Sequence, residues 1–455
     1  MVVPLRELHI QNFRGVQEAT IRLDPRVTVL FGANAAGKTT ILDALAIGLG
    51  AITSKVPGAK GRDFAKRGDL RTRWQRDAVG NPTAGIEAPF SRIELRSAEG
   101  IAWDVTKYRS QQDRPNVPKG RGRQQLHDWL DPRVLEALNN PTNEPTSPIP
   151  LVAAYGNERA VVDVPLRERD FNTEFDRFGA LNESLRATTR FKTVFEWFRV
   201  MEDEERRTGR DRRSFDYRLP ALEWVRRTVS AARIRCRDPR VEIKPIRMLV
   251  DFEHEKGALQ SLDISSLSDG YRTHFALIVD LARRMIQLNP SDDLDDPHRG
   301  TNSPAVVLID EVDLHLDPRW QARVLQGLLD AFPNTQFVVT THSEQVLGSV
   351  SASQVRHLRW SDETIVVDEV PFAQGATGER ILVELMGAPQ RVDGPVTHKL
   401  RQYLGMVERD LGETAEAAAL RAELDHALAD DPALHRADLE IQRRQLMARL
   451  RGDQG

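Results

Sequence analysis

The feature that most constrains the fold of this chain is a glycine-rich octapeptide, GANAAGKT, at residues 32–39. It satisfies the pattern GxxxxGK[ST], with a β-prone run, VTVLF, before it and an apolar helical pattern, TILDALAIGLG, after it. Such a strand–loop–helix unit cradles phosphates, because its glycines let backbone N–H groups turn inward and the helix N-terminus adds positive partial charge. The sequence therefore predicts an α/β nucleotide-binding fold around this loop.

The residue types within the loop predict separate roles in nucleotide binding. Lys38 is expected to bridge the β- and γ-phosphates, and Thr39 is expected to ligate Mg²⁺. ATP and Mg²⁺ are thus the expected cofactors. The predicted ATP-binding set is Gly32, Ala33, Asn34, Ala35, Ala36, Gly37, Lys38, Thr39 and Thr40.

A second apolar run, AVVLI at residues 305–309, ends in Asp310 and Glu311. A strand that delivers Asp310 to its carboxyl end would let this carboxylate hold Mg²⁺ through water, as the second metal-binding residue beside Thr39. The adjacent Glu311 can polarise the attacking water as a general base. Taken alone, the pair is equally typical of the start of a solvated loop, so its assignment depends on the phosphate-binding loop.

Composition limits the classes of function. The 455 residues are 40% hydrophobic, enough for a sizeable core, and the formal net charge of -3 means that any DNA contact must be a local basic patch. The single cysteine, Cys236, excludes an internal disulfide and is interpreted as a buried thiol. The longest apolar run, Ile41 to Ile52, is too short to span a bilayer, and the N-terminus has no continuous apolar stretch of the kind a signal peptide carries, so we expect a soluble cytoplasmic protein without membrane contact.

Patterning predicts an ATPase head over residues 1–370 and a helical region over 371–455. Residues 55–150 are rich in Gly, Pro and Arg with short β-prone pieces and no long periodic segment, which predicts a β-lobe. About residues 171–235, apolar residues recur at three- and four-residue spacings, which predicts a short helical insertion. The 371–455 region is a candidate for partner binding or oligomerisation, although a simple packing appendage fits equally well.

The segment LSDGYR resembles the ABC signature LSGGQ, with Asp269 in place of a glycine and a different ending at Tyr271 and Arg272. In that family the signature orders the γ-phosphate bound by the opposite subunit. The resemblance therefore implies that Ser268 and Gly270 act in trans. The alternative is an ordinary helix cap at Ser268.

Two further segments follow in the order of the same family. LHLDPRW resembles the D-loop through Asp317, and FVVTTHSEQV places His342 just beyond an apolar run, where ABC ATPases have a histidine that contacts the γ-phosphate. A lone histidine would be unremarkable, but the order of motifs is that of an ABC/SMC-type P-loop NTPase head, which adds His342 to Glu311 as a predicted catalytic residue. The family's Q-loop glutamine is not identified: Gln111 and Gln112 lie in a suitable interval, and neither is assigned.

The opening LHIQNFRG is similar to the start of RecF, SMC and overcoming-lysogenization-defect ATPases, which adds Arg14 to the predicted ATP-binding residues. Lys38 and Ser268 are 230 residues apart, too far for a typical transporter head, and the insertion is too short for an SMC coiled coil. Pieces such as AAYGNERAVVDVPLRERDF, LIDEVDLHLDPRWQ and ERILVELMGAP resemble bacterial AAA family ATPases of antiphage defence, namely PtuA of Septu systems and its retron-associated relatives. This resemblance covers about residues 5–390.

The resemblance implies a homodimer, or a higher oligomer, with ATP held between Lys38 of one subunit and Ser268 of another. It also implies a slow, Mg²⁺-dependent ATPase that senses or gates, with an HNH-type effector nuclease or retron components as partner. The alternative is a RecF-like DNA-binding ATPase of repair or recombination. DNA is a candidate partner because residues 107–123 hold six basic residues beside Tyr108, although a solvated loop fits that segment equally well.

Overall fold

The computed structural model describes residues 3–76, 82–114, 117, 120, 122–140, 144–157, 174–186, 191–243, 246–254 and 257–452. The chain forms two compact units, unit 1 (Met1–Ile381) and unit 2 (Leu382–Gly455). Within the described part of the chain, none of the helices combines the length and the apolar composition needed to cross a bilayer.

Unit 1 is built on a six-stranded sheet in the order β15-β14-β3-β13-β12-β8. Its strands are β3 (Val27–Phe31), β8 (Leu151–Tyr155), β12 (Ala305–Ile309), β13 (Thr335–Thr340), β14 (Val355–Ser361) and β15 (Thr364–Glu369). All neighbours pair in parallel except β14 and β15, which form an antiparallel hairpin at one edge. Every residue of β3, β8, β12 and β13 is buried, which accounts for their unbroken apolar sequences, because a parallel sheet is covered on both faces. The predicted α/β fold class of the P-loop head is confirmed.

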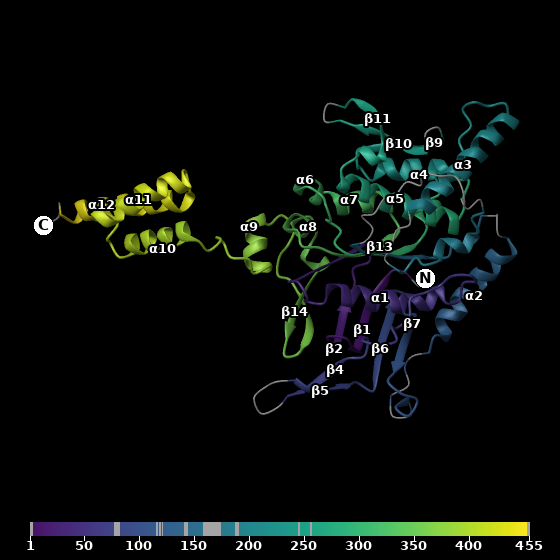
Figure 1. Cartoon of the computed structure of the whole chain (residues 1–455), viewed down its shortest axis with the longest axis horizontal. Coiled ribbons are helices and arrows are strands. Elements are labelled where there is room, and N and C mark those ends of the chain that lie inside the picture. Colours follow the sequence, from purple (N-terminus) through teal and green to yellow (C-terminus); the bar gives the residue numbers. More distant parts are fainter. Residues whose placement is uncertain are drawn as a thin grey trace. The chain divides into compact units, whose positions relative to one another are not determined.

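Residues 55–150, the predicted β-lobe, contribute β6 and β7 to an antiparallel sheet in the order β2-β1-β6-β7, whose other two strands come from the N-terminal segment. Its strands are β1 (Leu5–Phe13), β2 (Val16–Arg22), β6 (Phe90–Ser97) and β7 (Ala102–Tyr108), and a separate hairpin joins β4 (Thr72–Arg76) to β5 (Pro82–Glu87). Helix α1 (Lys38–Thr53) lies between this sheet and the main sheet (Figure 1). The approach is close: Trp103 Nε1 donates to the carbonyl of Gly48 at 2.9 Å, and a Cβ at Gly48 would lie 2.6 Å from Leu95. Burial on both sides explains why the helix is apolar almost all round.

One helix of the lobe region contradicts the expectation that residues 55–150 hold no long periodic segment. Helix α2 spans Gln124–Asn139 and contains Pro132. Its buried residues, Leu126, Leu130, Val134 and Ala137, follow helical spacing, so the signal was present in the sequence. Pro132 hides it, because proline normally ends a helix by removing one backbone hydrogen bond.

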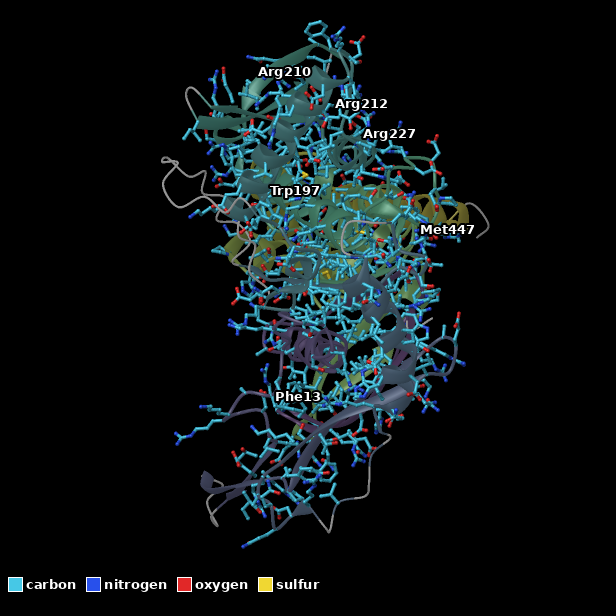
Figure 2. All side chains as sticks on the ribbon, turned by 90° about the vertical axis from the view of Figure 1, so that its right-hand side faces the viewer. Phe13, Trp197, Arg210, Arg212, Arg227 and Met447 are labelled. Carbon is cyan, nitrogen blue, oxygen red and sulfur yellow. The ribbon has the colours of Figure 1, made fainter. Side chains whose placement is uncertain are left out.

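Between residues 171 and 235 the described chain forms η3 (Arg177–Leu181), α3 (Phe191–Asp211) and α4 (Pro220–Ala231). An antiparallel sheet follows, β11-β10-β9, built from β9 (Cys236–Ile243), β10 (Ile246–Glu253) and β11 (Leu259–Asp263). It leads through η4 (Ile264–Ser266) into the long helix α5 (Asp269–Leu288). Figure 2 shows Arg210, Arg212 and Arg227 at this end of unit 1 and Phe13 of the β-lobe at the other end.

Short elements complete unit 1. They are η5 (Gly300–Asn302), α6 (Pro318–Gln321), α7 (Val324–Ala331), α8 (Glu344–Gly348), η6 (Ala352–Gln354) and α9 (Gly378–Arg380), and the π-helix η7 (Ile381–Leu385) starts at its last residue. Unit 2 contains α10 (Pro395–Glu408), α11 (Ala415–Leu428) and α12 (Pro432–Gly452). Its small core is formed by Leu400, Tyr403, Val407, Ala417, Leu424, Leu434 and Ala437. Unit 2 therefore has a hydrophobic core of its own.

Candidate functional site

The phosphate-binding loop joins the carboxyl end of β3 to the first turn of α1. Gly32, Ala35 and Gly37 have φ angles of 153°, 64° and 97°, which turn the loop back on itself. A Cβ at Gly32 would lie 2.2 Å from the carbonyl oxygen of Leu358, and one at Gly37 would lie 2.3 Å from Ile365. Glycine is therefore required at both positions by backbone conformation and by the neighbouring β14–β15 hairpin.

Two predicted magnesium-binding residues, 271 positions apart in the sequence, meet at the carboxyl edge of the main sheet. Thr39 Oγ1 donates a hydrogen bond to Asp310 Oδ2 at 3.0 Å. Asp310 follows β12, and its N–H donates to the carbonyl of Tyr155 at the end of β8. A hydroxyl beside a carboxylate is the oxygen donor set that Mg²⁺ uses in nucleotide sites, so these side chains fit that ion.

Thr340, at the end of β13, organises the two acidic residues. Its hydroxyl donates to Asp310 Oδ1 at 2.5 Å and accepts the backbone N–H of Glu311 at 2.7 Å. Glu311 has a φ of 49°, a left-handed conformation that costs a non-glycine residue about 1–2 kcal/mol. The buried threonine holds this turn in place, and strain of this kind is typical of functional sites.

Lys38 lies within the loop that it is expected to serve. Its ammonium donates to the carbonyls of Gly32 at 2.9 Å and Ala33 at 3.1 Å, and the residue is 8% exposed. Burial lowers the pKa of Lys38, and the carboxylates of Asp310 and Glu311 offset part of that shift. The charge thus stands in a partly desolvated position near the carboxylates of Asp310 and Glu311, which is compatible with the predicted role in phosphate binding.

A cavity of about 400 Å³ opens beside these groups and identifies a residue that the sequence did not. Thr39 and Asp310 line it together with Asn157, which follows β8, the parallel neighbour of β12. Gln111 and Gln112 lie instead in the turn after β7 and do not line this cavity. Asn157 therefore lies beside the Thr39–Asp310 pair, and the only sequence signal for it was the apolar run LVAAY before it; the Q-loop residue stays unassigned.

Arg14 is engaged by two carboxylates of the protein. Its Nη1 donates to Asp43 on α1 at 2.6 Å and its Nε donates to Asp69 at 2.8 Å. Asp43 also pairs with Arg62 at 2.6 Å and lines the cavity beside Thr39. In this structure Arg14 therefore acts through Asp43, one helical turn after Thr39, and its contact with ATP stays a prediction.

The signature segment begins α5. Ser268 occupies the N-cap position, is exposed, and makes no side-chain capping bond, so its hydroxyl is not used by its own helix. Gly270 is buried, and a Cβ there would lie 2.3 Å from the carbonyl oxygen of His315. Close packing against the D-loop segment thus explains this glycine without reference to a ligand.

Asp317 and His342 lie in neighbouring segments. Asp317 caps α6 by accepting the N–H of Arg319 at 3.0 Å. His342 is exposed just beyond β13, and the next residue, Ser343, donates to Gln321 at 2.7 Å. A hydrogen bond therefore links the histidine segment to the helix that follows the D-loop.

The basic segment 107–123 is partly engaged within the chain, and positions 115, 116, 118, 119 and 121 lie outside the described residues. Lys107 donates to the carbonyls of Ala65 and Lys66, and Arg109 pairs with Asp113 at 3.0 Å. The described basic side chains of the segment 107–123 thus have intramolecular partners.

The piece AAYGNERAVVDVPLRERDF lies outside the described residues from position 158 onward.

Comparison with known proteins agrees with this geometry. Residues 27–348 match the sequence model of a family described as "AAA domain, putative AbiEii toxin, Type IV TA system". The "Retron Ec83 probable ATPase" of Escherichia coli is 27% identical over 496 aligned positions, covering 96% of this chain and 86% of that protein. "Septu protein PtuA" of Bacillus mycoides is 33% identical over 121 positions, covering 26% of this chain and 16% of that protein. Among solved structures, an SMC head bound to the C-winged helix domain of ScpA aligns over 81% of this chain and 98% of its own, with 14% identity and a TM-score of 0.43. The predicted resemblance to retron ATPases and PtuA is confirmed.

Proposed function

The chain belongs to the family of AAA domains that its residues 27–348 match, and from that premise we propose that it is the ATP-hydrolysing sensor of an antiphage defence complex, which gates a partner nuclease. The observation that carries the ATPase part is the hydrogen bond from Thr39 to Asp310. It joins the phosphate-binding loop to the acidic strand end, the two parts that phosphoryl transfer needs side by side.

The residues of the site support separate roles in ATP hydrolysis. Lys38 and the inward-turned backbone N–H groups of the loop bind the β- and γ-phosphates. Thr39 and Asp310 would hold Mg²⁺, which, when bound, neutralises charge on the phosphates. Glu311 accepts a proton from the attacking water, and Asn157 orients that water from the neighbouring strand end.

The signature supports a site completed by a second subunit. Ser268 presents an exposed hydroxyl at the N-terminus of a 20-residue helix, where the helix dipole favours an anion. In a head-to-head homodimer this hydroxyl and the N–H groups of the first turn would meet the γ-phosphate held by Lys38 of the partner. ATP binding and dimerisation would then be one event.

The partner is proposed from the relatives. Retron ATPases and PtuA bear names of defence systems, and after His342 the described chain offers no group of three or more His, Cys, Asp or Glu suited to holding a metal. We therefore assign DNA cutting to a separate effector. Unit 2, with its own core, is the part of the chain that we propose to bind this effector.

Phage plating tests the proposal. A strain carrying this gene with its flanking genes is expected to restrict phage, and Lys38→Ala is expected to abolish restriction and weaken ATP binding about a hundredfold or more, because charge-assisted hydrogen bonds to phosphate are lost. Lys55→Ala, in the turn after α1, is the matched control and should behave as wild type. Full restriction by Lys38→Ala would contradict a role for ATP in defence.

The RecF-like alternative has the same ATP chemistry, but ATP hydrolysis would control DNA binding in repair and not a partner nuclease. It requires ATPase activity stimulated by DNA and no nuclease bound to unit 2. Pull-down from the same strain with a tagged chain separates the two. Recovery of a flanking nuclease, lost on deletion of residues 382–455, supports defence, whereas DNA recovered without a nuclease supports repair.

A further inference from the structure

A second cavity, of about 930 Å³, lies in unit 1, and the signature residues Ser268 and Gly270 form part of its lining. Its walls are the connection from α4 to β9, the first turns of α5, and the segment around α6 and α7. Among the residues that the structure describes, it shares no lining residue with the phosphate-binding loop or with the Thr39–Asp310 cavity. Its volume is that of a small-molecule site.

The cavity carries an excess of positive charge. Among the described residues that line it, five are arginines and two are carboxylates. Two of the arginines have partners: Arg233 pairs with Asp330 at 2.9 Å, and Arg237 pairs with Glu253 at 2.5 Å. A third, Arg319, also interacts within the chain, which leaves Arg235 and Arg323.

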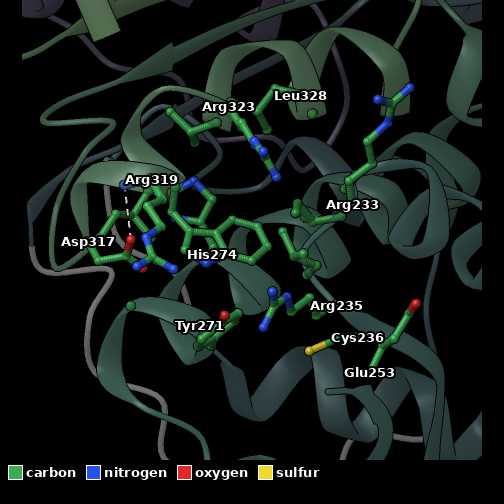
Figure 3. Close-up of a pocket in the computed structure, with 18 of the residues that line it drawn as sticks. Arg233, Arg235, Cys236, Glu253, Tyr271, His274, Asp317, Arg319, Arg323 and Leu328 are labelled. Carbon is green, nitrogen blue, oxygen red and sulfur yellow. Dashed lines mark hydrogen bonds between the residues drawn. The ribbon is translucent and has the colours of Figure 1, made fainter. Parts of the chain in front are cut away.

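Arg235 and Arg323 are the unpaired charges. Neither side chain has a hydrogen bond or ion pair to any residue within the described ranges. Figure 3 shows them reaching into the cavity from opposite sides, Arg323 from the segment before α7 and Arg235 from the segment before β9, whereas Arg233 points away. Two guanidinium groups converging on one space repel each other unless an anion lies between them.

The backbone around Arg235 is held in an unusual conformation. Arg233 and Arg235 both have a φ of 57°, a left-handed conformation that glycine adopts without cost and arginine adopts at about 1–2 kcal/mol. Ile234 and Cys236 between and after them are 4% and 1% exposed, which anchors the segment in the core. The buried neighbours thus fix the backbone of both arginines in a left-handed conformation that non-glycine residues normally avoid.

The rest of the described wall is mixed: polar side chains such as His274 and Gln326 lie beside an aromatic and apolar part. Tyr271 and Trp320 meet edge to face at 5.1 Å, and Ile278, Leu316 and Leu328 line the same space. An inorganic anion would use only the arginines. A ligand that fills the cavity needs a phosphate for the guanidinium groups and a flat ring for the aromatic wall.

We propose that this cavity is a second nucleotide site, separate from the phosphate-binding loop, in which Arg235 and Arg323 grip the phosphates and the base lies against Tyr271 and Trp320. Arginine binds phosphate oxygens through paired, charge-assisted hydrogen bonds, and aromatic rings stack on bases of any sequence. The bound nucleotide contacts the residue three positions after Ser268. If the proposed dimer forms through Ser268, occupancy of this site regulates it.

Counting bound ADP on the full-length protein tests the proposal, because ADP occupies nucleotide sites without being hydrolysed. Equilibrium dialysis with radiolabelled ADP should give two per chain for wild type and one for Lys38→Ala. In the double variant Arg235→Gln/Arg323→Gln, ADP should still bind at the Lys38 site with unchanged affinity. Its affinity for the second site should fall about ten- to a hundredfold. Arg233→Gln is the matched control, since it has the same backbone conformation but an internal partner, and it should bind two.

The outcomes separate this site from the phosphate-binding loop. One ADP per wild-type chain and none for Lys38→Ala overturns the second site and leaves the proposed ATPase intact. Binding lost in the double variant but unchanged in Lys38→Ala supports the second site and counts against the loop. A 5′-phosphorylated oligothymidylate that binds Lys38→Ala where ADP does not overturns the proposal in favour of a nucleic-acid end. Photolabelling of Lys38→Ala by 8-azido-ADP should mark the peptide that contains Tyr271 or Trp320, and labelling elsewhere overturns it.

Discussion

Asp280, at the middle of α5, is 1% exposed and is the negative centre of a buried charge network. It accepts hydrogen bonds from Arg283 at 2.7 Å, from Arg284 at 2.8 Å and from the Tyr155 hydroxyl at 3.0 Å. Tyr155 is the residue whose carbonyl accepts the N–H of Asp310. The network therefore connects α5 to the strand ends of the candidate site.

Replacing Asp280 by Asn should be costly, because it leaves two buried guanidinium groups without a counter-charge. Breaking a buried ion pair from one side costs about 3–5 kcal/mol. Tyr155→Phe removes one hydrogen bond to the same carboxylate but leaves the ion pairs intact, and it should cost about 1.5–3 kcal/mol. Asp203→Asn, which breaks an exposed Asp–Arg pair on α3, is the matched control and should cost less than about 0.5 kcal/mol.

The network also predicts the dependence of stability on pH. Burial raises the pKa of Asp280, but Arg284 and Arg283 more than offset it and lower that pKa from 3.8 to about 2. A carboxyl with a depressed folded pKa stabilises the protein above its unfolded pKa and loses that contribution as pH falls towards the folded pKa. The shift corresponds to about 2 kcal/mol, of which about 1 kcal/mol is lost by pH 3.

Urea unfolding followed by tryptophan fluorescence measures this directly, since all seven tryptophans lie in unit 1. The free energy of unfolding of wild type should exceed that of Asp280→Asn by several kcal/mol at pH 7, and the gap should shrink between pH 5 and pH 3. A loss no larger than that of Asp203→Asn, or a gap independent of pH, would refute the reasoning.

Three further predictions concern the site. Glu311→Gln should keep ATP binding but slow hydrolysis by about 10²–10⁴-fold, so that an ATP-bound dimer accumulates in size-exclusion chromatography; hydrolysis at the wild-type rate would point to another base. Gly270→Ala should place a methyl group against the carbonyl of His315 and abolish hydrolysis while nucleotide binding by the loop persists; a fully active variant would show that the D-loop can move aside. Burial raises the pKa of Cys236 to about 12, so iodoacetamide at pH 8 should label the folded thiol roughly a thousandfold more slowly than the urea-unfolded one, and equal rates would contradict its burial.

Some of the site was predictable because it is local in the chain. The phosphate-binding loop needs eight consecutive residues, and the positive φ angles at Gly32 and Gly37 arise within the loop itself, although the β14–β15 hairpin also leaves no room for a Cβ there. Asp310 and Glu311 come directly after an apolar strand, so their position at the carboxyl edge of a sheet could also be predicted from the sequence. Helix α2 was missed although its spacing was visible, because Pro132 is an exception that tertiary packing tolerates.

Other features were decided only by contacts between distant segments. Asn157 became a site residue because β8 pairs with β12, and the sequence LVAAYGN carries no mark of that pairing. The carboxylates that engage Arg14 come from α1 and from the segment before β4, which nothing near Arg14 predicts.

The eight residues around Lys38 were enough by themselves to predict a phosphate-binding loop, because backbone geometry and charge act over one turn of chain. The signature glycine and the arginines beside it are different. The carbonyl of His315 leaves no room for a side chain at Gly270. Arg323, which lies 88 positions after Arg235 in the sequence, faces it across the cavity. Such choices depend on which surfaces long-range packing brings together, and only the folded chain contains that information.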